Sequence, residues 1–483
     1  MTALACVILT AVAGYFSFGL GNAWWLAWLA PVPVLWFACG ETQAWKAILA
    51  AWAAYALGLT SLMRAYLNVF PGPVLTLNIL APALLFALAT AGARRVNRAL
   101  GPVPAMLAFA GLWAGCDLLI SFYPGVGSIT SPAGAETVAP MLIQSASLVG
   151  FVGITFLLGS VAAGIALSLR TRTPAPLLIA AALFAANAVY GYLRVSRAPA
   201  GTVRVALVNS NTYGYWADFN KSPAASGQAA RQIVGAYTAE VQKLGRDNVQ
   251  LVVLPENIAP IAEPWHDDSR TKLAAAADAT GATLIGGFNA VRDGARRNMA
   301  WAFAPGMSRP VTYEKRHLVP GLETRAFTPG RGPTILGDDV EPEICFDMDF
   351  PQMIRHDAVT LRPRLLAVPA SEIGTHGDWS NLDSAADDWF HARNAVLRSV
   401  ENGVPMARSA GRGLLMLNDR YGRIIAQTKT SANFTTLVGD LPLDGRGGST
   451  LYDQIGDTFG WLCLALGTGL LASSAVTRRR QTP

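Results

Sequence analysis

The run from Met141 to Leu169 contains no charged residue. A bilayer core of about 30 Å is crossed by roughly 20 apolar residues in a helix, because backbone polar groups in hydrocarbon must be paired within the segment. Counting this run, the candidate spans are 3–20, 23–39, 46–63, 75–93, 103–121, 141–169, 175–193 and 459–476. The sequence therefore predicts a polytopic α-helical membrane domain of about eight spans. A signal peptide is disfavoured, because no basic segment precedes the first apolar run.

Charged residues are spread unevenly along the chain. Residues 1–199 carry nine Lys or Arg and three Asp or Glu, whereas residues 200–455 carry 26 and 28. The net charge of +6 therefore arises outside the polar region, so a basic surface for nucleic acid is not expected. We predict three parts: a membrane domain of seven spans at 1–199, a polar domain at 200–455, and a final span with a basic tail at 456–483.

The basic residues alternate between the loops that connect the predicted spans. Lys and Arg collect in cytoplasmic loops, and here they follow every second span, at Lys46, at 94–98, at 170–172 and at 478–480. This pattern predicts cytoplasmic termini and a polar domain on the outer side of the membrane. In a bacterium, that is the periplasmic side of the cytoplasmic (inner) membrane.

Cys345 is the only cysteine outside the predicted spans. An unpaired thiol in an oxidising compartment is a liability unless chemistry requires it. A metal site is not expected, since no second cysteine accompanies Cys345 and no HxxxH-type pair is present. The other four cysteines lie in apolar runs and are expected to behave as small buried hydrophobic residues.

The polar domain alternates short apolar runs with helical stretches. Such alternation indicates an α/β domain with its own core. Predicted helices are 228–244, 269–279 and 384–401. Predicted strands are 203–208, 251–254, 283–287, 299–303, 344–346, 365–368, 405–409, 414–417 and 424–426.

Three segments near predicted strand ends carry groups suited to catalysis. They contain Glu256 after a buried strand, Lys315 in a basic segment, and Cys345 in an apolar run. A carboxylate, a lysine and a thiol supply a base, an oxyanion stabiliser and a nucleophile when they converge. Taken singly, each has a common structural explanation: a solvated strand-end glutamate, a charged surface lysine and a core cysteine.

Together, in this order and at separations of 59 and 30 residues, these three resemble the Glu-Lys-Cys triad of the nitrilase (carbon-nitrogen hydrolase) superfamily. The segment 391–405 resembles the late helix and strand of that superfamily. With the membrane spans, the resemblance narrows to the apolipoprotein N-acyltransferase family, whose patterns are similar to 24–31 and 450–457 here.

The resemblance implies a nitrilase-like α-β-β-α sandwich and covalent acyl transfer without a cofactor. Cys345 would attack a phospholipid acyl ester to form a thioester, with Glu256 as general base and Lys315 stabilising the oxyanion. The acceptor would be the N-terminal diacylglyceryl-cysteine of an apolipoprotein. Supporting or substrate-binding roles are implied for Glu323, Trp216, Phe346 and Asp347.

Three segments depart from the family pattern. Asp347 stands where the acyltransferases usually have Glu, and the segments 320–323 and 368–379 differ from the usual sequences. The alternative function is therefore a membrane-anchored amidase or an acyltransferase with a different amine acceptor. A non-catalytic membrane scaffold is opposed by the intact triad.

Overall fold

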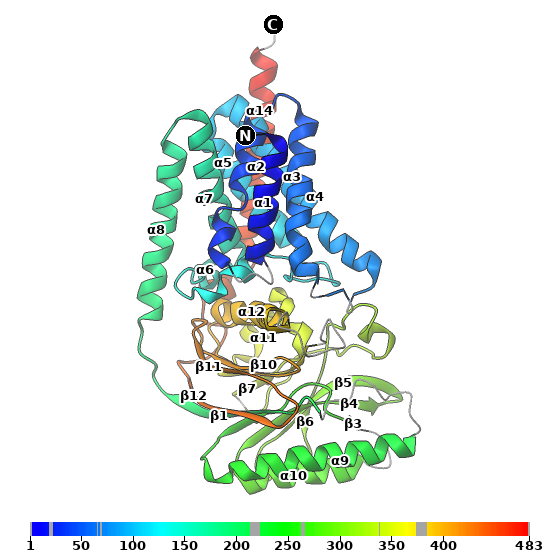
Figure 1. Ribbon diagram of the computed structural model, residues 1–483. Helices are drawn as coiled ribbons and strands as arrows, with labels where there is room; N and C mark the ends of the chain where they lie inside the picture. Colours follow the sequence, from blue (N-terminus) through cyan, green and yellow to red (C-terminus); the bar gives the residue numbers. More distant parts are fainter. Residues whose placement is uncertain are drawn as a thin grey trace. The chain divides into compact units, whose positions relative to one another are not determined.

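The computed structural model describes residues 2–18, 23–64, 66–67, 70–212, 223–261, 266–337, 339–372 and 384–481 (Figure 1). Contacts within the chain divide it into two compact units. The first contains Met1–Arg197, Thr375–Leu397 and Gln454–Pro483, and the second contains Ala198–Gly374 and Arg398–Asp453. The predicted division of the chain into three parts, at 199/200 and 455/456, stays a prediction.

The first unit is helical. Six of its described helices are long and apolar enough to cross a membrane. They are α3 (Ala44–Arg64), α4 (Gly72–Leu100), α5 (Pro102–Ser121), α7 (Phe151–Thr171), α8 (Ala175–Val195) and α14 (Thr458–Gln481). The first two predicted spans are shorter apolar helices, α1 (Ala3–Phe18) and η1 (Trp24–Trp28) with α2 (Val32–Gly40). These helices fit a membrane protein, and a count of eight spans stays a prediction.

Helix α5 packs against α4, α7 and α14 within this unit. Two of its glycines allow α14 to approach closely. A Cβ at Gly111 would lie 2.7 Å from the Cys463 carbonyl oxygen, and one at Gly115 would lie 2.8 Å from Leu464 Cβ. Small residues at helix interfaces in membranes permit such backbone contact.

The predicted span 141–169 is wrong in its first part. Residues 141–150 form turns and the short helix α6 (Ala146–Val149), and the long helix α7 begins only at Phe151. Gly150 adopts a φ of 74°, which interrupts a right-handed helix. The apolar composition of the run is thus shared between a buried loop and a span.

The second unit contains two β-sheets. The first has the order β12-β1-β2-β4-β5-β6, with β3 beside β4, and the second has the order β11-β10-β9-β8-β7. First-sheet strands are β1 (Thr202–Asn209), β2 (Leu251–Val253), β3 (Pro260–Ile261), β4 (Thr283–Arg292), β5 (Ala295–Phe303), β6 (Val311–Glu314) and β12 (Thr435–Pro442). Second-sheet strands are β7 (Val340–Pro342), β8 (Leu365–Ser371), β9 (Met406–Gly411), β10 (Leu414–Asn418) and β11 (Ile424–Lys429).

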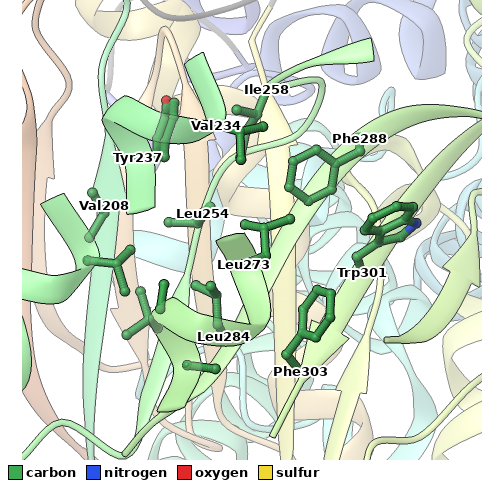
Figure 2. Packing of buried hydrophobic residues seen from close by; sticks show 14 of the residues in the cluster. Val208, Val234, Tyr237, Leu254, Ile258, Leu273, Leu284, Phe288, Trp301 and Phe303 are labelled. Carbon is green, nitrogen blue, oxygen red and sulfur yellow. The ribbon is translucent and has the colours of Figure 1, made fainter. Parts of the chain in front are cut away.

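The two sheets pack face to face around a shared apolar core that includes Val205, Val253, Ala300, Ala367 and Ala407. On the other face of the first sheet, α9 (Pro223–Gln242) and α10 (His266–Thr280) bury a second cluster with Phe288, Trp301 and Phe303 (Figure 2). Helix α11 (Pro351–Leu361) and the last residues of α12 (Ser384–Asn402) belong beside the second sheet, where Asn418 donates a hydrogen bond to Ser399 (2.9 Å). The predicted α-β-β-α sandwich is confirmed.

One predicted strand is wrong. Residues 344–346 were expected to be extended, but Cys345–Asp349 form the 3₁₀ helix η5 directly after β7. Cys345 has a φ of 47°, in the left-handed region that a strand cannot accommodate. The apolar composition of Ile344 and Phe346 reflects burial there and not strand pairing.

Candidate active site

Glu256 is fixed between the two sheets. It follows β2, and its backbone N–H donates to the carbonyl oxygen of Ala370 in β8 (3.1 Å). Gly287 of β4 lies directly against it, since a Cβ there would be 2.5 Å from Glu256 Cα. A side chain at 287 would therefore force the backbone at Glu256 to shift. The Glu256 residue is 4% exposed, so the carboxylate is held in a protein interior.

Lys315 brings two carboxylates together. It follows β6 and is 1% exposed. Its Nζ lies 2.8 Å from Glu256 Oε1 and 2.8 Å from Glu323 Oε2. Glu323 Oε2 also accepts from the backbone N–H of Val319 (2.9 Å), which closes the loop between lysine and glutamate. The structure thus brings three predicted residues, Glu256, Lys315 and Glu323, into one buried cluster.

Asn298 completes this cluster and was missed from the sequence. Its Nδ2 donates to Glu256 Oε1 (2.6 Å) and to Glu323 Oε1 (2.8 Å). It lies in β5 on the same face as Ala300, one of the residues between the sheets. A polar residue in phase with the buried positions of an alternating strand was the available signal.

The pKa values in the cluster reflect one cation shared by two acids. Burial alone would lower the pKa of Lys315, but the charges of Glu256, Glu323 and Cys345 outweigh it and the pKa lies well above its usual range. Burial raises the pKa of Glu323; Lys315 opposes this and the nearby Glu256 adds to it. Lys315 therefore stays charged, while Glu323 holds a proton more readily than an ordinary glutamate.

Cys345 occupies a strained turn at the end of the second sheet. Its Sγ lies 3.7 Å from the Ser371 carbonyl oxygen, and the residue is 6% exposed. A positive φ at a residue other than glycine costs energy and is found where function requires a particular direction of a side chain. Ser371 follows Ala370, whose carbonyl oxygen accepts from the Glu256 N–H, so Cys345 and Glu256 lie at the same end of β8.

Asp347 binds the backbone and side chains around the site. It is fully buried; Oδ1 accepts from the backbone N–H of His317 (2.8 Å), and Oδ2 lies 2.7 Å from the Tyr313 hydroxyl. The hydroxyl is also 2.7 Å from Glu343 Oε2. A hydroxyl has one proton to donate, so the second carboxyl must share or hold a proton. Burial raises the pKa of Glu343 well above its usual range; Arg316 opposes this and Asp347 adds to it.

Arg316 was not predicted to have a role, but it connects the lysine segment to the cysteine turn. Its guanidinium contacts Glu343 (2.7 Å) and Asp357 of α11, which lie on either side of Cys345 in sequence. Lys315 and Cys345 are therefore positioned by neighbouring side chains that bind each other. Phe346 packs edge-on against Phe350 at 5.2 Å between ring centres, so it contributes to the apolar wall of the turn.

Two predicted features lie outside the described residues. Trp216 falls in the segment 213–222, and most of the divergent segment 368–379 falls in 373–383. The described part, through Glu372, ends β8 beside Cys345 and carries an ion pair between Glu372 and Arg408.

Comparison with known proteins bears on both units. The family model described as the apolipoprotein N-acyltransferase N-terminal domain matches residues 10–164. A protein named apolipoprotein N-acyltransferase from Geobacter metallireducens is 26% identical, over 94% of this chain and 91% of its own length. The resemblance to the apolipoprotein N-acyltransferase family is confirmed. A relative of the same name from Agrobacterium fabrum is 25% identical, over 59% of this chain and 58% of its own length.

The match to the N-acyltransferase family model runs from within α1 to within α7, and the Geobacter relative extends it across the two sheets. Solved structures similar to this chain include an amidase from Nesterenkonia sp., at 20% identity over 50% of this chain and 92% of that chain, with a TM-score of 0.39. Another is a carbon-nitrogen hydrolase from Helicobacter pylori G27, at 17% identity over 50% and 89%, with a TM-score of 0.40.

Proposed function

We propose that this protein transfers a fatty acyl chain from a phospholipid, through a thioester on Cys345, to the N-terminal diacylglyceryl-cysteine of apolipoproteins. The observation that carries the proposal is the buried cluster of Glu256, Lys315, Glu323 and Asn298 beside a strained cysteine turn. The relatives named apolipoprotein N-acyltransferase support the choice of an apolipoprotein as acceptor.

In the first half-reaction Glu256 removes the proton of the Cys345 thiol, and the thiolate attacks the ester carbonyl carbon of the phospholipid. Lys315 stabilises the charge that develops on the carbonyl oxygen. The tetrahedral intermediate collapses with cleavage of the ester C–O bond. The lysophospholipid oxygen leaves with the proton from Glu256, so the enzyme retains only the acyl group as a thioester.

In the second half-reaction the free α-amine of the lipoprotein attacks the thioester carbonyl carbon. Glu256 accepts a proton from the amine, the C–S bond breaks, and the sulfur recovers that proton as a thiol. The acceptor leaves as an amide. The enzyme returns to its starting state, so neither a cofactor nor an external oxidant enters the cycle. Glu323 supports Lys315 through the 2.8 Å contact to Nζ.

The membrane unit is suited to substrates that both reside in a bilayer. We propose that the unit with the two sheets lies on the periplasmic side of the bacterial inner membrane, as the loop charges predict. Donor and acceptor would then meet the enzyme by diffusion in two dimensions. Burial of the site limits water, which would otherwise hydrolyse the thioester.

The alternative is a membrane-anchored amidase or an acyltransferase for another amine. Asp347, in place of the glutamate usual in the family, is the observation that favours it. In this structure the Asp347 carboxylate contacts His317 and Tyr313 and its residue is fully buried, so its contacts are internal. Because Asp347 contacts only neighbouring protein groups among the described residues, these contacts support a positioning role for it. Other residues would then select the acceptor.

The test uses purified full-length protein with a phospholipid labelled in its acyl chain and a synthetic diacylglyceryl-cysteine peptide. We expect labelled N-acyl peptide and lysophospholipid, and an acyl group on Cys345 when the peptide is omitted. Cys345→Ala should abolish all three, whereas the matched control Cys463→Ala, in α14, should retain them.

Two results would contradict the proposal. Release of free fatty acid, or of ammonia from an amide, without peptide acylation would favour the amidase alternative. Lipid turnover by Cys345→Ala would exclude Cys345 as the nucleophile.

A further inference from the structure

The outer face of the first sheet carries a pocket apart from the Glu256 cluster. It has a volume of about 550 Å³ and is lined by residues of α10, of strands β4, β5 and β6, and of the turn between β5 and β6. Cavities of a few hundred cubic ångströms are the usual size for small-molecule sites.

Three arginines line this pocket. Arg270 pairs with Asp267 (3.2 Å), and Arg292 pairs with Glu314 (3.1 Å). For Arg309, no hydrogen bond or ion pair occurs with any part of the chain that the structure describes. Among the described lining residues Asp267 is the single acid, so the described walls carry an excess of positive charge. Arginine presents several donors in a plane and binds phosphate and carboxylate groups in pairs of hydrogen bonds.

Trp301 provides a second, independent observation. The residue is 2% exposed, lines the pocket, and its indole Nε1 is buried with no hydrogen-bond acceptor among the described residues. Figure 2 shows this nitrogen on the edge of the ring that points away from Phe288 and Phe303. A buried donor without an acceptor carries an uncompensated desolvation cost, which a ligand oxygen would offset. Met299 and Val291 add apolar surface beside the ring.

The pocket is separated from the candidate active site by the thickness of one sheet. Side chains alternate between the faces of a strand. In β5, Asn298 and Ala300 face the second sheet, whereas Met299 and Trp301 face outward with the α9 and α10 cluster. A ligand in the pocket therefore cannot contact Glu256 or Cys345, and the pocket is a distinct site.

We propose that this pocket binds a small organic anion that carries a phosphate or carboxylate group on a flat, apolar portion. The anionic group would lie against Arg270 and Arg309, and an acceptor oxygen would bond to Trp301 Nε1. The flat portion would pack on Met299 and Val291. No bond is made or broken at this site.

The test is calorimetric titration of the full-length protein with phenyl phosphate, which has both features of the ligand. Inorganic phosphate and benzyl alcohol each supply only one of them. We expect phenyl phosphate to bind more tightly than either. The double variant Arg270→Ala/Arg309→Ala should weaken binding by about 10-fold or more, since it removes the charged donors for the anionic group.

Two further variants decide between this pocket and other anion sites. Trp301→Phe retains the apolar ring and loses the N–H, so it should weaken phenyl phosphate binding severalfold while the protein stays folded. Arg246→Ala removes an exposed arginine outside the pocket and should leave binding unchanged. Equal binding by the double variant and the wild type would overturn the proposal, as would binding of an acidic peptide but not of phenyl phosphate.

Discussion

On strands β5 and β6, side chains directed between the sheets and those directed outward meet different surroundings. Inward, Asn298 and the adjoining Lys315 hold two buried carboxylates at 2.6–2.8 Å. Outward, Glu314 forms ion pairs with Arg292 and Arg297 at 3.1 and 3.5 Å in partial contact with solvent. The charges of Glu314 and Lys315, which are adjacent in the chain, thus differ in energetic weight, because charge interactions strengthen as water is excluded.

The largest expected effect comes from Lys315→Met. It leaves Glu256 and Glu323 without their cation, and loss of one partner of a buried ion pair destabilises a protein by about 3–5 kcal/mol. Thioester formation should fall by about 100- to 1,000-fold or more, as for other losses of oxyanion stabilisation. Thermal unfolding and acylation of Cys345 measure the two effects. Lys315→Arg serves as the folded comparison, and near-normal acylation in both variants would contradict a role in the chemistry.

A smaller loss is expected for Gly287→Ala. The new methyl group would lie 2.5 Å from Glu256 Cα, so Glu256 must move. We expect a destabilisation of about 1–3 kcal/mol, typical of overpacking, with a lower acylation rate. The matched control is Gly235→Ala in α9, where a Cβ meets no atom within 4 Å. It should raise stability by about 0.5–1 kcal/mol with no change in rate. Similar rates in both variants would show that the position of Glu256 is not limiting.

Glu323→Gln tests the raised pKa of Glu323 in the buried cluster with Glu256 and Lys315. The folded pKa of Glu323 is raised, so its contribution to stability is full below the ordinary value of about 4.5 and is lost as pH rises through the folded value. The glutamine variant has no such titration. The melting temperature of the variant relative to the wild type should therefore increase with pH above about 4.5. Parallel melting curves across the pH range would show that Glu323 titrates normally.

The smallest effect is expected on the outer face, for Glu314→Gln. The Glu314 side chain is 18% exposed, and pairs of this kind contribute about 0–1 kcal/mol. Cys345 acylation should remain at the wild-type rate. A loss comparable to that of Lys315→Met would mean that the two faces of the strand are not energetically separate.

The charged residues of the buried cluster could be predicted from the sequence, whereas the amide that binds them could not. Glu256, Lys315 and Glu323 could be predicted because their order and spacing resemble a known family. Asn298 could not be singled out, because its partners lie 42 and 25 residues away and meet it only through sheet packing.

The fold was predicted where periodicity was strong. Residues 384–401 and 283–287 appear within α12 and β4. The strand prediction for 344–346 was wrong because an apolar run predicts burial and not backbone conformation. Cys345 has a positive φ, which a strand does not accommodate. The predicted start of a span at 141 was wrong for a related reason, since α7 begins only at Phe151. A buried loop in such a helical unit is as apolar as a span.

Glu256 and Lys315 extend from the first sheet, whereas Cys345 extends from the second. The distance between the Glu256 carboxylate and the Cys345 sulfur therefore depends on the spacing between the two sheets. Much of that spacing is set by alanines, including Ala300, Ala302, Ala367 and Ala407. A larger side chain at any of these positions would move Glu256 and Cys345 further apart without changing either residue.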